Sequence, residues 1–176
     1  MASPASRLAL RLSRRAFHSL ALATATLLTA CASPPTGLPS DLPHWSGRLA
    51  LRVDADSGTH PQSVAVLFDL QGSSDQGELI LETPLGNRLA QLSWDPTQAL
   101  LITSQQQLRS TSVDELLQTA TGTPAPPLQV LFDWLSGVAT SAPGWSIDLS
   151  RHSEGLITAT RTAPAPQATL RIAFSR

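Results

Sequence analysis

The residue whose setting most clearly predicts covalent chemistry is Cys31, the only cysteine in the sequence. It stands directly after Leu28-Thr29-Ala30, at the end of an apolar run that begins at Phe17, and four arginines precede that run. A basic segment, a short apolar run and small residues before a cleavage site are typical of a secretory signal peptide, which is not part of the folded protein. The run is shorter than the roughly 20 residues that a transmembrane helix needs. We therefore predict that residues 1–30 are a signal peptide.

The residues Leu28-Thr29-Ala30-Cys31 resemble the lipobox of bacterial lipoproteins. The resemblance implies that Cys31 is diacylated on sulfur, becomes the first residue of the mature chain, and is then acylated on nitrogen. An ordinary signal peptide with a chance cysteine at its end is the alternative. Stable anchoring needs more than one acyl chain, and two or three chains on one cysteine supply it. By resemblance to enteric lipoproteins, where aspartate after the cysteine retains a protein in the inner membrane, Ala32 permits the outer membrane.

No other motif predicts covalent chemistry, and we expect a protein with no enzymatic activity, no cofactor and no metal. The sequence has no Gly-x-Ser-x-Gly elbow, no His-Glu-x-x-His motif and no glycine-rich phosphate loop. His44, His60 and His152 lie beside predicted turns and loops, and we expect them to be solvated surface residues. Glu78 and Glu82 stand on one strand roughly 13 Å apart, whereas a retaining glycosidase pair needs about 5 Å.

The composition of the predicted mature chain limits its partners. Four of the twelve basic residues lie in the signal segment, so 12 − 4 leaves eight arginines against thirteen carboxylates. Without a dense basic face, such a chain is a poor candidate for binding nucleic acid. A single cysteine also excludes an internal disulfide or thiolate metal site. Residues 31–43 are rich in Pro, Ser and Gly and predict a flexible lipidated tether, and residues 44–176 are long enough for a single domain.

Alternating apolar residues predict five short strands in the first half of this domain, with turn residues between them. The predicted strands are residues 45–53, 63–70, 78–83, 88–94 and 99–103. Close spacing of this kind favours an antiparallel meander. Three further strands are predicted near the end of the chain, at residues 145–149, 156–161 and 168–174.

Two short helices are predicted between the two groups of strands. Ser112 to Glu115 fits a capping box in which Ser112 is the cap and Glu115 reaches back, and Gly122 ends the helix. Pro127 can open a second helix at its first position, and Gly137 ends it. Its apolar stripe consists of Leu128, Leu131 and Leu135, with Val130 and Trp134 beside them. The order indicates an α+β or open-barrel design, in which helices cover one mouth or face of a curved sheet.

The loop Thr83-Pro84-Leu85-Gly86-Asn87 joins two predicted strands, and its Pro, Gly and Asn are ordinary hairpin residues. Leu85 is not, because a large apolar side chain at the tip of a tight turn has little nearby to bury it. Two interpretations remain from the residues alone. Leu85 folds back onto the sheet, or it is an apolar finger for a membrane or a ligand.

Up to about Val138, several segments of this sequence match the motifs of one protein family in their order and spacing. They are the lipobox, Trp45-Ser46-Gly47-Arg48, Val66-Leu67-Phe68-Asp69, Pro84-Leu85-Gly86, Val113-Asp114-Glu115-Leu116-Leu117 and Leu131-Phe132-Asp133-Trp134-Leu135-Ser136-Gly137. In these segments the chain resembles the LolB family, outer-membrane lipoproteins that receive and insert other lipoproteins. The chain after Val138 matches weakly and is short of the aromatic residues that many relatives carry.

The resemblance implies a mostly β fold: an unclosed antiparallel β-barrel with short helices as a lid over an apolar cavity. It implies that Leu85 protrudes and serves membrane insertion, and that Cys31 anchors the protein to the periplasmic face of the outer membrane. The implied partners are a LolA-like periplasmic carrier, client lipoproteins and outer-membrane lipid, and we expect a monomer. The candidate cavity residues are Leu49, Leu51, Val64, Val66, Phe68, Leu79 and Leu81 from the strands, and Leu131, Trp134 and Leu135 from the lid.

Three other functions stay open at this point. A structural or assembly lipoprotein would have a fully packed interior, and a module for free lipids would bind fatty acids but accept nothing from a carrier. An undetected hydrolase would show turnover. The sequence also leaves open which face of each strand points inward, because an alternating pattern defines two faces but not which of them is covered.

Overall fold

The computed structural model describes residues 41–55, 60–121 and 125–176. The predicted signal peptide, Cys31 and the tether up to residue 40 lie outside the described residues, as do Gly58 and Gly122. All described elements belong to one compact unit. Within the described ranges, no helix combines the length and the hydropathy needed to cross a membrane.

The described chain forms nine strands, two α-helices and one short 3-10 helix, η1. The strands are β1 His44–Val53, β2 Gln62–Gly72, β3 Gly77–Glu82, β4 Arg88–Trp94, β5 Ala99–Thr103, β6 Gln107–Ser110, β7 Trp145–Asp148, β8 Leu156–Arg161 and β9 Ala168–Ser175. The helices are α2 Val113–Thr121, α3 Leu128–Leu135 and η1 His152–Glu154.

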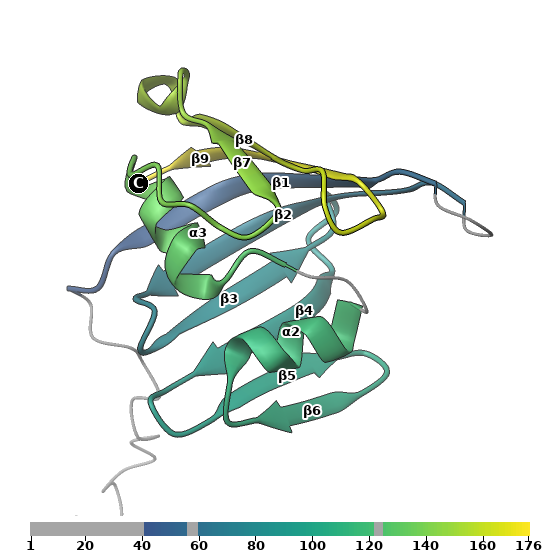
Figure 1. Ribbon diagram of the computed structural model, residues 1–176. Helices are drawn as coiled ribbons and strands as arrows, with labels where there is room; N and C mark the ends of the chain where they lie inside the picture. Colours follow the sequence, from purple (N-terminus) through teal and green to yellow (C-terminus); the bar gives the residue numbers. More distant parts are fainter. Residues whose placement is uncertain (1–40, 56–59, 122–124) are drawn as a thin grey trace, which may run out of the picture. The chain divides into compact units, whose positions relative to one another are not determined.

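All nine described strands belong to one antiparallel sheet in the order β6-β5-β4-β3-β2-β1-β9-β8-β7. The first six strands form a meander, and the last strand, β9, pairs with β1 at the centre of the sheet (Figure 1). In the described chain no pairing joins the edge strands β6 and β7. The predicted mostly β, unclosed antiparallel architecture is therefore confirmed.

The pairing register gives the sheet one apolar face, which we call the inner face. Trp45 pairs with Leu70, Leu70 with Leu79, and Leu79 with Leu92, so these side chains lie on the same side of four neighbouring strands. Leu49 pairs with both Val66 of β2 and Ile172 of β9, so the same apolar face continues from β2 through β1 to β9. Period-two alternation places the polar residues of these strands, such as Arg48 and Asp69, on the opposite, outer face.

Both helices lie over the inner face (Figure 1), and their apolar residues join the sheet in one core cluster. Helix α2 packs on β5 and β6. Helix α3 is held against the sheet by aromatic side chains, because the Phe132 ring lies 5.6 Å from Trp45 and 6.2 Å from Trp94, edge to face in both pairs. These edge-to-face contacts are favourable beyond the area that they bury.

Trp94 can lie flat on the sheet because its partner across β3 and β4 is a glycine. Gly77 pairs with Trp94, and a Cβ at Gly77 would collide with the indole ring. The indole N–H donates to the Ser73 carbonyl at 2.9 Å, which fixes the ring over the β2–β3 turn. The close approach therefore seals this end of the inner face.

The hairpins define two ends of the sheet. The β1–β2, β3–β4, β5–β6 and β8–β9 connections all turn at one end, which we call the Leu85 end because Leu85 lies in the β3–β4 hairpin. Strand β1 begins at the opposite end, which we call the Trp45 end. The chain therefore enters the sheet at the end opposite to Leu85.

Four details of the sequence prediction were wrong. The prediction placed no strand at β6, because Gln107 to Ser110 has one apolar residue and no alternation that could reveal it. Strand β2 begins at Gln62, one residue before the predicted Ser63, and ends at Gly72 instead of Leu70. Ser112 does accept a hydrogen bond from the Glu115 N–H (3.4 Å), but the Glu115 carboxylate accepts one from Ser110 Oγ (2.8 Å) instead of reaching back to the cap. Pro127 is the N-cap of α3 and not its first helical residue.

Both ends of α3 are held by contacts outside the helix body. The Leu128 N–H at its start donates to Asp114 Oδ1 of α2 at 2.9 Å. At its end, Gly137 adopts a φ of 87°, and its N–H donates to the Trp134 carbonyl. The Val138 N–H donates to the Asp133 carbonyl. This pattern satisfies the last carbonyl groups of the helix.

We expect Asp114→Ala to destabilise the protein by about 1–2 kcal/mol, because it leaves the first N–H of α3 without its acceptor. Asp114→Asn keeps an oxygen at the same place and serves as the matched control, with a smaller loss. Urea unfolding of the three proteins measures the difference. Equal stability of wild type and Asp114→Ala would show that the inter-helix contact contributes nothing.

Candidate functional site

The β3–β4 hairpin presents Leu85 to solvent. The Thr83 carbonyl accepts a hydrogen bond from the Gly86 N–H (2.9 Å), and Thr83 Oγ1 accepts one from the Asn87 N–H (3.1 Å). Gly86 has a φ of 82°, a conformation that glycine adopts without strain. The Leu85 side chain is 88% exposed, so it does not fold back onto the sheet. This exposure removes the first of the two interpretations of Leu85.

Burial on the inner face of the long strands changes from one end to the other. At the Trp45 end, Trp45 and Leu92 are 2% exposed and Leu70 is 1% exposed. Toward the Leu85 end, Leu51 is half-buried and Val64 is 45% exposed. On β1 and β2 the apolar inner face is therefore sealed at the Trp45 end and accessible toward the end from which Leu85 protrudes.

The register places all seven predicted strand residues of the cavity on the inner face. Val66 and Phe68 are buried at 4% and 5% exposure, and Val64 is exposed. The other four are half-buried and pack against the core cluster: Leu49, Leu51, Leu79 and Leu81. These four leucines are large apolar side chains on the helix-covered side of a sheet that still reach solvent.

The three predicted residues of the lid differ in burial. Trp134 is 0% exposed and Leu135 is 1% exposed, whereas Leu131 is half-buried. At 100° per residue, Leu131 lies between Trp134 and Leu135 around the helix axis. Leu131 therefore sits in the middle of the buried side of α3 and faces space that is less filled than the space around its neighbours.

Trp134 packs in the core and also connects the end of α3 to the segment that follows it. Its indole N–H donates to the Thr140 carbonyl (2.8 Å), and Thr140 Oγ1 donates to Asp133 Oδ2 (2.7 Å). Its ring lies 6.4 Å from the Trp145 ring. The end of α3 is thus fastened to the segment that leads into β7.

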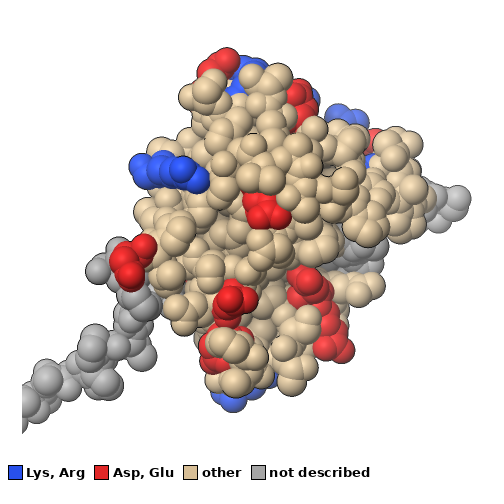
Figure 2. Space-filling view, turned by 60° about the vertical axis from the view of Figure 1, so that its left-hand side comes forward, with Lys and Arg blue, Asp and Glu red and all other residues tan. Residues whose placement is uncertain are grey.

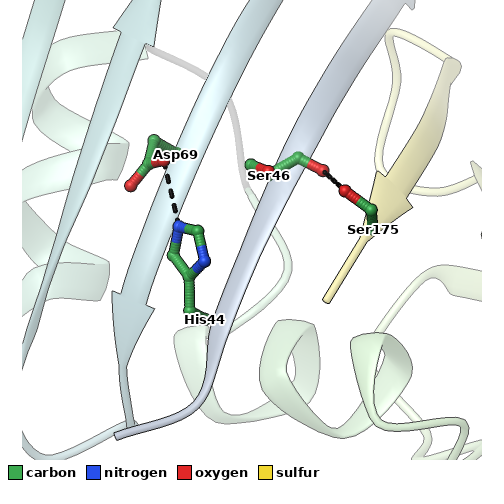
Figure 3. Close-up of polar contacts among 4 residues, drawn as sticks. All are labelled: His44, Ser46, Asp69 and Ser175. Atoms are coloured by element: carbon green, nitrogen blue, oxygen red, sulfur yellow. Dashed lines mark hydrogen bonds and ion pairs between the residues drawn. The ribbon is translucent and has the colours of Figure 1, made fainter. Parts of the chain in front are cut away.

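The histidines are not equivalent. His44 Nε2 lies 3.0 Å from Asp69 Oδ2 on the outer face near the start of β1, where Ser175 Oγ also donates to the Ser46 carbonyl (3.5 Å; Figure 3). His152 was predicted to be solvated, and this was wrong. It is half-buried, its Nε2 donates to the Leu135 carbonyl (3.0 Å), and its ring packs 5.4 Å from Phe174.

Charged groups are sparse on this protein, of which 14% of residues are charged. Figure 2 shows small groups of acidic and basic side chains on one face, with broad uncharged surface between the groups. Glu78 and Glu82 are half-buried on the outer face, and Glu78 accepts a hydrogen bond from Gln91. Among the described residues no group of three or more His, Cys, Asp or Glu side chains could hold a metal ion.

The sequence prediction missed two residues of the inner face, Trp145 and Arg161. They pair across β7 and β8, and the Arg161 guanidinium carbon lies 5.6 Å from the centre of the Trp145 ring. Arg161 is 1% exposed and donates through Nη2 to the Pro166 carbonyl (2.8 Å). Burial lowers the pKa of this guanidinium, which still stays charged at neutral pH. Alternation of Trp145 and Ile147 could have indicated the face of Trp145, but no sequence signal marks Arg161 as buried.

Comparison with known proteins places this arrangement in a family. No curated protein matches the chain. Residues 44–173 match the family described as outer membrane lipoprotein LolB. The match includes strands β1 to β8, both described α-helices and all but the last two residues of β9. The family match extends past Val138. It therefore includes the last strands, where the sequence motifs alone resemble the family only weakly. The protein belongs to the LolB family of outer-membrane lipoproteins.

Proposed function

We propose that this protein is an outer-membrane-anchored receptor that accepts lipoproteins from a periplasmic carrier and inserts them into the outer membrane. The observation that carries the proposal is the inner face, on which half-buried Leu51 and exposed Val64 lie toward the end from which Leu85 protrudes. Membership of the LolB family supports the location and the class of cargo. The decisive test is to mix the protein with a carrier loaded with lipoprotein and to measure transfer.

The acyl chains of the cargo explain why an apolar interior is needed. A triacylated lipoprotein carries on the order of 45 methylene groups, and exposing them to water costs roughly 36 kcal/mol at about 0.8 kcal/mol each. Release into the periplasm is therefore excluded, and the chains pass directly from one apolar site to the next. Transfer then runs downhill in affinity, with the carrier weakest, this receptor stronger and the bilayer strongest.

The positions of the anchor and of Leu85 set a requirement on the tether. Strand β1 begins at the Trp45 end and has ten residues, which span about 33 Å. The thirteen residues from Cys31 to Pro43 reach at most about 45 Å when fully extended. That reach is enough for an acylated Cys31 and the Leu85 hairpin to touch the same membrane surface.

We expect Cys31→Ala, expressed with a cleavable signal, to give a soluble periplasmic protein that still accepts lipoproteins from the carrier, since the anchor supplies location only. Fractionation and carrier-to-receptor transfer measure the two parts of this prediction. A folded Cys31→Ala protein that takes up no lipoprotein would show that the acyl anchor is part of the binding site.

We expect Leu131→Phe to leave the free energy of unfolding within about 1 kcal/mol of the wild type and to weaken lipoprotein uptake, because the larger ring fills space that the cargo needs. The matched control is Leu135→Phe, four residues along the same helix, where a sealed core should lose about 1–3 kcal/mol through overpacking. If Leu131→Phe destabilises as much as Leu135→Phe and leaves uptake unchanged, Leu131 is packed core and the interior is filled, as in a structural lipoprotein.

We expect Leu85→Glu to keep normal stability and normal uptake from the carrier but to deliver poorly into liposomes. A surface turn has little packing to lose. Burying one leucine in a bilayer gains about 2 kcal/mol, whereas the glutamate brings a charge into the interface. Thermal unfolding, transfer from loaded carrier and incorporation into vesicles measure the three properties.

Val138→Glu is the control for Leu85→Glu, since Val138 is also exposed (54%) and follows Gly137, which lies against His152 near the Trp45 end. It should deliver normally. If Leu85→Glu lowers uptake and delivery together, Leu85 belongs to the binding site and not to the insertion step. If Val138→Glu fails in delivery as well, added charge alone explains the defect.

A further inference from the structure

The indole N–H groups of the four tryptophans divide into two pairs. Trp94 and Trp134 donate to backbone carbonyls at 2.9 and 2.8 Å. The N–H groups of Trp45 and Trp145 are buried and have no acceptor in the described chain. A buried donor without an acceptor destabilises a fold, so each such group calls for an explanation.

The two unpaired tryptophans lie in different surroundings. Trp45 is 2% exposed at the sealed end of the inner face, between the Phe132 ring and the guanidinium of Arg176, which lies 5.3 Å from its centre. Trp145 is half-buried and is the first residue of the edge strand β7, where it pairs with Arg161 of β8 and forms an isolated bridge with Ala142. A ligand that enters the inner face can therefore reach the Trp145 ring but not Trp45.

Trp145 also lies at the level where such a ligand would enter. It pairs with Arg161, Arg161 with Ala168, and Ala168 with Val53, the last residue of β1, so all four side chains lie on the inner face at the Leu85 end. The charged guanidinium of Arg161 beside the ring adds a positive potential that favours an electron-rich oxygen. A hydrogen-bond donor and a positive charge thus lie close together at the Leu85 end of an otherwise apolar surface.

We propose that the Trp145 indole N–H, beside Arg161, binds an acyl ester carbonyl of a lipid cargo whose chains lie on the inner face. The inference rests on the proposed function, and it adds where the polar end of the cargo sits. Indole and guanidinium groups only donate hydrogen bonds, and an ester carbonyl only accepts them. Trp145 is half-buried, so a small movement of its side chain brings the buried N–H to the carbonyl without breaking the pairing of β7 with β8.

The test compares two ligands that differ only in the carbonyl groups: dioctanoylglycerol, a diester, and its dioctyl ether analogue. The acylated full-length mature protein is held in micelles of a polyoxyethylene alkyl ether detergent, which carries no carbonyl, and indole ¹⁵N–H signals follow each titration. The wild type should bind the diester about fivefold more tightly, the effect of one net hydrogen bond. The Trp145 N–H signal should shift with the diester and not with the ether.

Trp145→Phe keeps an aromatic ring and removes the donor, so its diester preference should fall to about one. Any effect of the smaller ring applies to both ligands and cancels in the ratio. Trp45→Phe removes the other unpaired donor and should keep the preference. Equal binding of both ligands by the wild type, a preference that survives Trp145→Phe, or one that Trp45→Phe also abolishes overturns the proposal while leaving an apolar binding site in place. Failure of the wild type to bind either ligand overturns the proposed function too.

Discussion

The constraint on which the structure depends is a mismatch between the apolar face of the sheet and the helices that cover it. Helices of nine and eight residues are about 14 and 12 Å long, whereas β1 and β2 each extend beyond 30 Å. The inner face is apolar or glycine from Trp45 to Val53 on β1 and apolar from Val64 to Leu70 on β2. Two short helices can seal part of it, and the part that they leave uncovered ends at the Leu85 hairpin.

Aromatic residues decide which part is sealed. Phe132 of α3 sits between Trp45 and Trp94, and Trp134 fastens the end of α3 to Thr140. These large rings bring α3 against the sheet at the Trp45 end, where glycine at position 77 leaves room for Trp94. Leu51 and Val64 lie farther along β1 and β2, and those side chains keep contact with solvent. The same chain thus has a packed core at one end and an accessible apolar surface at the other.

The sequence predicted much of this arrangement and could not predict the rest for identifiable reasons. Alternation placed β4, β5 and β8 at their observed bounds, since each has a clear apolar face between turn residues. It could not find β6, which is polar, nor show which side of each strand the helices cover, because that depends on pairing. Leu131 and Trp134 are both apolar residues on the same side of the predicted helix, so the sequence does not distinguish them. Their burial differs because of neighbours that are distant in the sequence. Arg161 is buried by pairing with Trp145 and by the Pro166 carbonyl, neither of which composition reveals.

The two proposals together give the cargo an orientation. An ester carbonyl held at Trp145 places the acyl chains deeper on the inner face and leaves the polypeptide of the client outside, at the Leu85 end. Leu85 protrudes at that same end. In the proposed mechanism, the opening through which the chains enter is therefore also the one that meets the membrane. The cargo then does not have to reverse its orientation inside the receptor between uptake and delivery. Releasing one hydrogen bond at the rim is a small barrier beside the many methylene groups that the bilayer takes up, so the donor at Trp145 sets orientation without trapping the cargo.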